Sequence, residues 1–362
     1  MASARFWLAA VLAVGWLWAL PCGADLLPPA AALPAAGMNA GSPHSGNSAL
    51  RPGLSCYEPA YFGFIGWKPG SAPTRELECY IPFQVSMQYP LVPLNLDLFG
   101  EWKYPEGKLI DQDRSALYFV YNGRYDFFMY GRYSAPVVSR RQNPGAYFDF
   151  AGFLGGPDVA CGYFHESNGQ DIETREAYQA RQAKDGQAQD FVSRGWDYWL
   201  YGAKKRFLLP DDLTPAWVTW INQQPLAWLN EHLFKRKSSG GLKSEAAAIT
   251  LGAQFLFFRG EGLGGRMEED DFWDESTVTP IHRSDYDGIR VSGVLESEHW
   301  RVSETVRWGY TNGRYPSSDF SLTCKLGGWL PLSLHWFDGY GPDLTTYHVR
   351  SNSVLLGLEF AQ

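Results

Sequence analysis

The chain has 362 residues, of which 31 are Lys or Arg and 39 are Asp or Glu, so its formal net charge is −8 at pH 7. A chain with this acidic balance lacks the basic surface that nucleic-acid binding requires, which argues against a nucleic-acid partner. The 15 Trp, 20 Tyr and 22 Phe supply apolar surface for one large domain, and no shift in composition after residue 56 indicates a second one.

The first 24 residues have the pattern of a secretory signal peptide. Arg5 precedes an apolar run over residues 6–20, and small residues follow up to Ala24. Residues 25–55 are rich in Ala, Pro, Gly and Ser, which predicts a flexible tail. The folded domain is therefore expected over residues 56–362.

The cysteines are consistent with export. Cys22 would fit a lipoprotein signal, but the proline immediately before it fits that alternative poorly. In an oxidising compartment Cys56 and Cys79 could pair, and the sequence leaves that question open. Cys161 and Cys324 are isolated strand residues, and no cysteine pair has metal-ligand spacing.

Beyond the signal peptide, no stretch reaches the roughly 18 apolar residues that a membrane-spanning helix needs. Apolar and polar residues instead alternate with period two, most clearly from Leu117 to Met129, where aromatic residues occupy odd positions. The candidate strands in chain order are 80–91, 117–129, 146–155, 158–167, 193–207, 215–222, 246–258, 287–298, 300–311, 320–326, 329–338 and 354–360.

An even number of long alternating strands joined by turn signals predicts an all-β fold, a transmembrane antiparallel up-and-down β-barrel of about 12 strands. Closure of the barrel satisfies every backbone hydrogen-bonding group in lipid. A secreted β-sandwich or lectin-like domain also alternates and is the alternative. One departure from the barrel pattern is the carboxyl terminus, because many such barrels end on an aromatic residue and here Phe360 is followed by two more residues.

A histidine and a serine lie two residues apart at the end of the predicted strand 158–167. Because strand side chains alternate, His165 and Ser167 are expected on one face, about 7 Å apart along the backbone. That face also carries Tyr163 and is expected to face lipid. An imidazole placed beside a hydroxyl can activate it as a nucleophile, although a polar strand end before an Asn-Gly turn is the alternative interpretation of an isolated H-x-S.

The next predicted strand supplies a carboxylate. A hairpin register that sets His165 opposite Asp197 also sets Ser167 opposite Gly195. Asp197 would then share its face with aromatic residues, where a carboxylate is costly unless it has a partner. A Ser-His-Asp relay, in which the acid orients the ring and stabilises imidazolium, provides that partner.

These residues resemble the signature of the outer-membrane phospholipase A family, H-x-S-N-G followed by S-R-x-W-N. Here the two parts are His165 to Gly169 and Ser193 to Asp197. The resemblance extends to most of the mature chain, through residues 57–61, 133–136, 339–341 and the final strand. It implies a twelve-stranded barrel in the bacterial outer membrane that hydrolyses acyl esters of membrane glycerophospholipids at a site on the outside of the barrel.

The resemblance implies a role for each motif residue. Ser167 would be the nucleophile, His165 the general base and Asp197 the residue that orients the ring, a position where the family usually has asparagine. The carboxylate should stabilise imidazolium more strongly, at the expense of its own desolvation. The backbone N–H of Gly169 would serve the oxyanion hole together with water polarised by calcium, whereas Asn168 holds the turn or touches substrate.

By the same resemblance, Ca²⁺ would be bound by the Ser193 hydroxyl and the Gln170 carbonyl, and by a carbonyl of Tyr133 of the partner subunit or of Ser134 of the partner subunit. The active form would be a homodimer. Asp171 either replaces a family carboxylate or begins an inserted helix. The 25 residues between Ser167 and Ser193 exceed the family's short loop, and residues 173–183 are rich in helix formers, so the insertion could shift the calcium site or cap it.

The working hypothesis is calcium-dependent hydrolysis of glycerophospholipid acyl esters, with phospholipase A1/A2 and lysophospholipase activity. The alternative is a noncatalytic outer-membrane porin or adhesin barrel that retains the motif. No phosphate-binding loop or zinc motif is present in the sequence.

Overall fold

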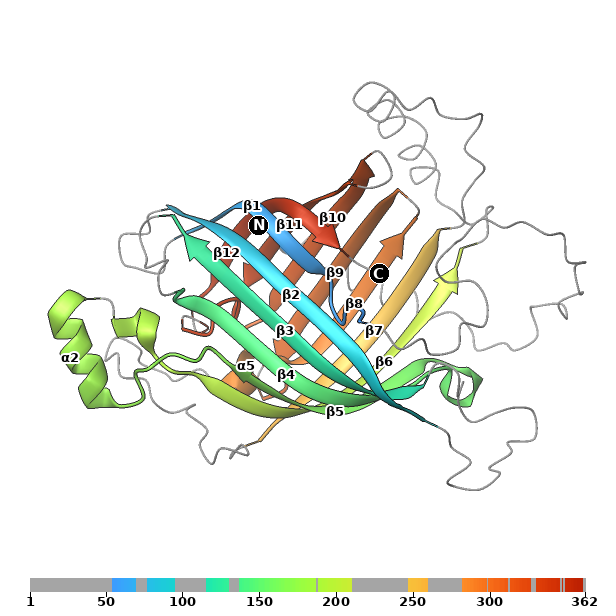
Figure 1. Cartoon of the computed structure of the whole chain (residues 1–362), viewed down its shortest axis with the longest axis horizontal. Helices are drawn as coiled ribbons and strands as arrows, with labels where there is room; N and C mark the ends of the chain where they lie inside the picture. The colour runs from blue at the N-terminus through green and yellow to red at the C-terminus, as the bar shows by residue number, and fades with distance from the viewer. Residues whose placement is uncertain are drawn as a thin grey trace, which may run out of the picture. The chain divides into compact units, whose positions relative to one another are not determined.

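The computed structural model describes residues 54–69, 77–94, 115–129, 137–186, 188–209, 247–259, 282–297, 299–311, 313–326, 330–345, 347 and 349–360. Within these ranges twelve antiparallel strands form a closed barrel in sequential order, which confirms the predicted all-β fold (Figure 1). The strands are β1 (Ala60–Pro69), β2 (Leu77–Pro93), β3 (Ala116–Phe128), β4 (Ser139–Phe150), β5 (Asp158–Ser167), β6 (Gly195–Leu208), β7 (Ala248–Phe258), β8 (Gly288–Glu296), β9 (Trp300–Gly309), β10 (Ser317–Leu326), β11 (Leu330–Gly339) and β12 (Ser351–Phe360).

Short helices lie in the connections. They are the 3-10 turns η2 (Phe153–Gly155) and η3 (Ala188–Phe191) and the α-helices α2 (Arg175–Asp185) and α5 (Arg283–Tyr286). No helix among the described residues has the length and apolar character needed to cross a bilayer.

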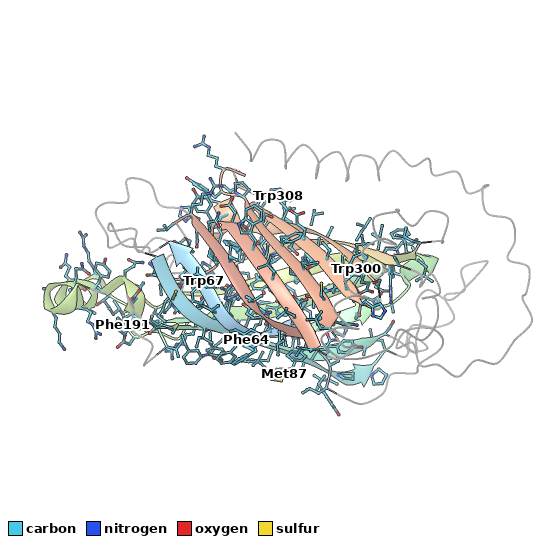
Figure 2. All side chains as sticks on the ribbon, turned by 90° about the horizontal axis from the view of Figure 1, so that it is seen from above. Phe64, Trp67, Met87, Phe191, Trp300 and Trp308 are labelled. Atoms are coloured by element: carbon cyan, nitrogen blue, oxygen red, sulfur yellow. The ribbon has the colours of Figure 1, made fainter. Side chains whose placement is uncertain are left out.

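The alternation predicted for β3 is present in the barrel wall. Phe119 is 44% exposed on the outer face, whereas Asn122 and Asp126 are buried on the inner face. Side chains project from both faces of the strands, and exposed Phe64 of β1 is labelled among them (Figure 2). The wall thus has an apolar outside and a polar inside, as expected for a barrel in lipid.

Paired charges fill the interior, around a cavity of about 290 Å³. Arg124 Nε lies 3.3 Å from Asp126 Oδ1 on β3, and Arg301 Nη1 lies 2.7 Å from Glu359 Oε1. Buried charges are stable only when they are paired and hydrogen-bonded. The inside of the barrel is therefore a packed polar core.

The structure departs most from the strand predictions at β1 and β4. β1 was not predicted, because its register with β12 shifts between Gly63 and Ile65, and a bulge breaks strict alternation. A Cβ on Gly63 would lie 2.5 Å from Pro82 Cγ, so glycine is required there. β4 begins at Ser139 rather than residue 146, since its polar first half pairs with β3 throughout. The candidate strand 215–222 lies outside the described residues.

The question of a disulfide is answered by the register. Ser55, next to Cys56, pairs with Gln88 of β2, and Cys79 lies nine residues away on that strand, about 30 Å at 3.3 Å per residue. That separation exceeds what a disulfide can bridge. All four described cysteines are free thiols. Residues 1–53, which contain the predicted signal peptide and most of the predicted tail, lie outside the described residues.

Candidate active site

The pairing of β5 with β6 brings His165 and Asp197 together. Residues 158–167 pair in continuous register with residues 195–204, so His165 lies opposite Asp197 and Ser167 opposite Gly195. This confirms the predicted register. His165 Nδ1 lies 2.7 Å from Asp197 Oδ1, and the histidine side chain is 50% exposed while the aspartate side chain is 5% exposed. In this contact Nδ1–H donates to the carboxylate, which leaves Nε2 as an acceptor.

Ser167 and the imidazole converge over Gly195. A Cβ built on Gly195 would lie 3.6 Å from Ser167 Cβ and 3.7 Å from His165 Cε1. The glycine therefore leaves open the space that borders both the hydroxyl-bearing carbon and the imidazole edge next to Nε2. A reacting group can enter that space without displacing the backbone.

The surroundings of the pair are aromatic. On β6, Trp199 and Tyr201 follow Asp197 at two-residue intervals and are 41% and 50% exposed, which places the carboxylate on the outer face as predicted. Trp199 also contacts Tyr163 of β5 edge to face, with ring centroids 5.1 Å apart, and pairs with Phe257 of β7. The His-Asp pair is thus set in an apolar outer wall.

The turn after Ser167 is held by a buried asparagine. Asn168 is fully buried, its Nδ2 donates to Val192 O at 2.8 Å, and its Oδ1 accepts from Arg194 N at 2.9 Å. Of the two roles considered for Asn168, the structure places it in the turn. Gly169 follows with φ 57°, a left-handed conformation that glycine adopts without strain.

The insertion between the two motif halves forms a helix, as the run of helix formers predicts. α2 begins after Thr174, whose hydroxyl accepts from Ala177 N at 3.2 Å, and Tyr178 packs in a buried cluster that includes Ile172. Ile172 also forms a parallel bridge with the far end of the insertion. Asp171 is exposed and lies before the Thr174 cap, so the alternative in which it begins α2 is wrong.

The proposed calcium ligands, Ser193 and Gln170, lie where the two ends of the insertion meet. Ser193 N donates to Ile172 O at 2.8 Å, which brings the two ends of the insertion together near Gln170. Among the described residues neither the Ser193 hydroxyl nor the Gln170 backbone carbonyl takes part in a hydrogen bond, and both are the neutral oxygen donors that Ca²⁺ accepts. These two residues therefore offer oxygens of the type that Ca²⁺ binds, as part of the six to eight that it takes. No group of three or more His, Cys, Asp or Glu side chains within the described ranges could hold a metal. Tyr133 and Ser134 lie outside those ranges.

The inner face of β5 carries a buried charge network that was not predicted from the sequence. Glu166 is fully buried, with Arg283 Nη2 of α5 at 3.1 Å and Arg141 Nε of β4 at 3.1 Å. Burial alone would lower the pKa of Arg283. The negative charge of Glu166 is the largest of the effects that oppose burial, and together they hold this pKa above its ordinary value. Burial would likewise raise the pKa of Asp287, yet Arg290 and Arg283 hold it well below the ordinary range.

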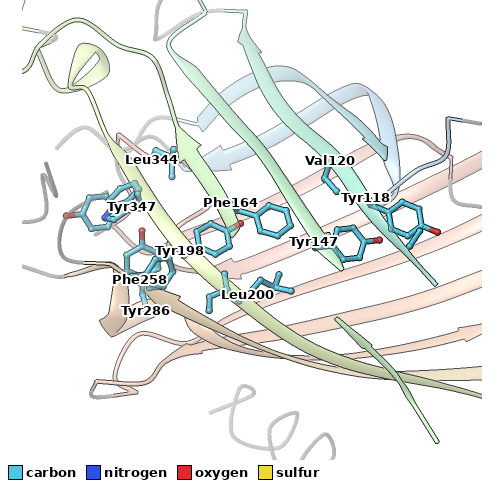
Figure 3. Close-up of a cluster of buried hydrophobic side chains, with 13 residues drawn as sticks. Tyr118, Val120, Tyr147, Phe164, Tyr198, Leu200, Phe258, Tyr286, Leu344 and Tyr347 are labelled. Atoms are coloured by element: carbon cyan, nitrogen blue, oxygen red, sulfur yellow. The ribbon is translucent and has the colours of Figure 1, made fainter. Parts of the chain in front are cut away.

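Aromatic packing continues inward from this network. Phe164 of β5 and Tyr198 of β6 stack with ring centroids 5.5 Å apart, and they lie side by side in the buried cluster (Figure 3). Tyr198 accepts a hydrogen bond from Asn143 Nδ2 at 2.7 Å. The backbone that displays His165 and Ser167 outward is therefore fixed from inside by charge pairs and stacked rings.

No family model matches the sequence, and no curated protein matches it. Among solved structures, the chain is similar to outer membrane phospholipase A from Escherichia coli, with 13% identity and a TM-score of 0.47, over 85% of this chain and 98% of that chain. An active-site mutant of the same protein matches with 14% identity and a TM-score of 0.47, over 85% and 92%. A Salmonella typhi outer membrane phospholipase, a dimer with bound calcium, matches with 14% identity and a TM-score of 0.49, over 86% and 93%. At this level of identity the similarity concerns the barrel and not the chemistry of the site; within that limit, the chain is similar over most of its length to solved outer membrane phospholipase A structures.

Proposed function

We propose that the protein is an outer-membrane serine hydrolase that cleaves acyl ester bonds of glycerophospholipids, with phospholipase A1/A2 and lysophospholipase activity. The observation that carries the proposal is the 2.7 Å contact between His165 and Asp197 on the outer wall, with Ser167 on the same face above the open position at Gly195. A carboxylate that orients an imidazole beside a serine is the arrangement that activates a hydroxyl.

In the first half of the reaction, Ser167 Oγ attacks the ester carbonyl carbon while His165 Nε2 accepts the hydroxyl proton. The Gly169 N–H donates to the oxygen that becomes negative. When the bond between the carbonyl carbon and the glycerol oxygen breaks, His165 returns the proton to that oxygen, and the lysophospholipid leaves as an alcohol.

In the second half, water attacks the acyl-serine, and His165 accepts a proton from the water. The bond to Ser167 Oγ then breaks, the proton passes to that oxygen, and the fatty acid leaves. Asp197 stabilises the imidazolium in both halves without itself taking the proton.

The apolar surroundings of the site favour a lipid as the substrate. Trp199, Tyr201 and Phe257 are between 41% and 50% exposed on the outer wall next to the His-Asp pair. In an aqueous location such a surface is costly, whereas in a bilayer it lies against acyl chains. A phospholipid whose ester carbonyl lies at the depth of the strand end would meet Ser167 directly.

Calcium and dimerisation complete the proposal. Ser193 and Gln170 would hold the ion with a carbonyl of the partner subunit, and bound calcium would polarise a water that stabilises the oxyanion. The dimer would therefore be the active form. Chemical cross-linking of the protein in membranes, with and without calcium, measures the dimer, and an equally active monomer would contradict this part of the proposal.

Ester release by the Ser167→Ala variant tests the function. We expect a loss of about 10⁴-fold or more in kcat, with an unchanged heat-modifiable barrel on gels. A fluorophosphonate probe should label the wild-type protein and not the variant, because only an activated serine reacts. A porin or adhesin that retains the motif would neither label nor release fatty acid. Activity unchanged in excess chelator would remove calcium from the mechanism and leave the serine assignment intact.

A further inference from the structure

An arginine on β4 reaches the turn that follows Ser167. Gln142 pairs with Ser167 across β4 and β5, and Arg140 lies two residues further along β4, on the same face. The inward neighbour Arg141 instead pairs with buried Glu166. Arg140 is therefore an outer-wall residue at the catalytic end of β5.

The guanidinium of Arg140 bonds to two consecutive carbonyls of the turn. Its Nε donates to Asn168 O at 2.6 Å, and its Nη2 donates to Gly169 O. Hydrogen bonds from a charged donor are roughly twice as strong as neutral ones, and two bonds from one planar group fix an orientation. The turn is also held on this side by Gln170, whose Nε2 donates to Val138 O at 2.8 Å.

These bonds determine where the Gly169 N–H points. Asn168 C=O and Gly169 N–H belong to one planar trans peptide unit, so they point in opposite directions. When Arg140 holds the carbonyl, the N–H is directed away from Arg140. Among the described residues the Gly169 N–H has no acceptor, so it is available to a ligand.

We propose that Arg140 is a positioning residue for the oxyanion hole. The inference rests on the proposed function and deepens it. Arg140 prevents the 168–169 peptide from flipping, and its charge on the carbonyl polarises the same peptide, which makes its N–H a stronger donor. Preorganised donors of this kind act mainly on the transition state, so the contribution belongs in kcat rather than in KM.

The test compares Arg140→Ala and Arg140→Lys with the control Arg350→Ala in the full chain. Arg350 is an exposed arginine of the β11–β12 loop that bonds to Asp338 of β11, at the same end of the barrel. Activity is measured per heat-modifiable barrel on phospholipid vesicles, together with the rate of fluorophosphonate labelling. Hydrogen exchange of a peptide spanning residues 166–172 reports the order of the turn.

For Arg140→Ala we expect kcat and the labelling rate to fall about 30- to 100-fold with KM changed less than about threefold, since loss of one oxyanion donor costs about 10²–10³ in kcat. Arg140→Lys should retain only part of the wild-type kcat and labelling rate, because the point charge of a lysine does not bridge two carbonyls as the planar guanidinium does. Millimolar guanidinium should restore activity to Arg140→Ala and leave Arg350→Ala unchanged, and exchange at 166–172 should rise only in the Arg140 variants.

Two results overturn the inference while the proposed function stands. One is an Arg140→Ala variant with wild-type kcat and labelling rate, and the other is a loss confined to KM, which would assign Arg140 to lipid binding. A wild-type protein without Ser167-dependent ester release would instead overturn the proposed function, and the inference with it.

Discussion

On β5, His165 and Ser167 point out of the barrel, while Phe164 and Glu166, each one residue away, point into it. The outer pair is accessible, and the histidine side chain is half exposed beside Asp197. The inner pair is fully buried, one in a stacked aromatic cluster and the other between two arginines. Because side chains in a strand alternate, one short segment presents reactive groups on one face and anchors itself with the other.

The difference separates two kinds of substitution. An outer residue makes few packing contacts, so its replacement should change chemistry and leave the free energy of unfolding nearly constant. An inner residue is desolvated and paired, so its replacement should change the free energy of unfolding and leave the turnover of the folded barrel nearly constant.

The largest expected effect is on the outer face, for His165→Asn. The asparagine Nδ2 occupies nearly the place of His165 Nδ1 and can still donate to Asp197, but no atom replaces Nε2. We expect kcat to fall about 10³-fold or more, with an unfolding midpoint in detergent equal to that of the wild type. Turnover within tenfold of the wild type would remove His165 as the general base.

On the inner face, Glu166→Gln should cost about 3 kcal/mol of the free energy of unfolding, because it leaves buried Arg283 and part-buried Arg141 with less compensating charge. Urea titration of the barrel in detergent measures this cost. Turnover per probe-labelled site should stay within about threefold. The matched control is Glu296→Gln, which breaks the part-exposed pair of Glu296 with Arg206 at 2.9 Å and should cost less than about 1 kcal/mol. Equal costs for the two variants would contradict the comparison.

What could be predicted from the sequence depends on whether a strand period or a motif marks the interaction. The period of two marks the alternation of β3, and the two-part motif marks the pairing of His165 with Asp197 on consecutive strands, so the sequence predicted both. The bulged β1 and the polar first half of β4 lack the period and were missed. Glu166 and Arg283 are 117 residues apart, and only barrel closure brings them together.

The same reasoning applies to Arg140. Its contact with the turn at residues 168–169 crosses from β4 to the end of β5, and no local motif marks it. The one available signal was the family resemblance of the motif, which implies that the Gly169 N–H is a donor but does not indicate what holds that donor in place.

A smaller effect is expected for Asp197→Asn. This substitution introduces asparagine, the residue usual at this position in the family whose signature the motif resembles. The amide oxygen can still accept from His165 Nδ1–H, so the ring keeps its orientation, but the negative charge that stabilises imidazolium is lost. We expect kcat to fall about tenfold. The unfolding midpoint should stay the same or rise, because a neutral amide costs less than a carboxylate to bury. A lower midpoint together with unchanged turnover would place Asp197 among the structural residues of the wall.

The smallest expected effect, for Gly195→Ala, tests whether the open position between Ser167 and His165 is used. The added methyl would lie in ordinary van der Waals contact with Ser167 Cβ and His165 Cε1, so the strand should accept it without a change in unfolding midpoint. It occupies space that an ester carbonyl would enter. We therefore expect kcat/KM for phospholipid vesicles to fall about threefold, which corresponds to somewhat less than 1 kcal/mol of activation free energy. Gly202→Ala on the same strand is the matched control, because its Cβ would also meet only ordinary contacts, the nearest being Gln254 Cγ at 3.5 Å. A loss at residue 195 that is absent at residue 202 locates the reacting group above Gly195, whereas equal turnover in both variants would place the ester elsewhere on the wall.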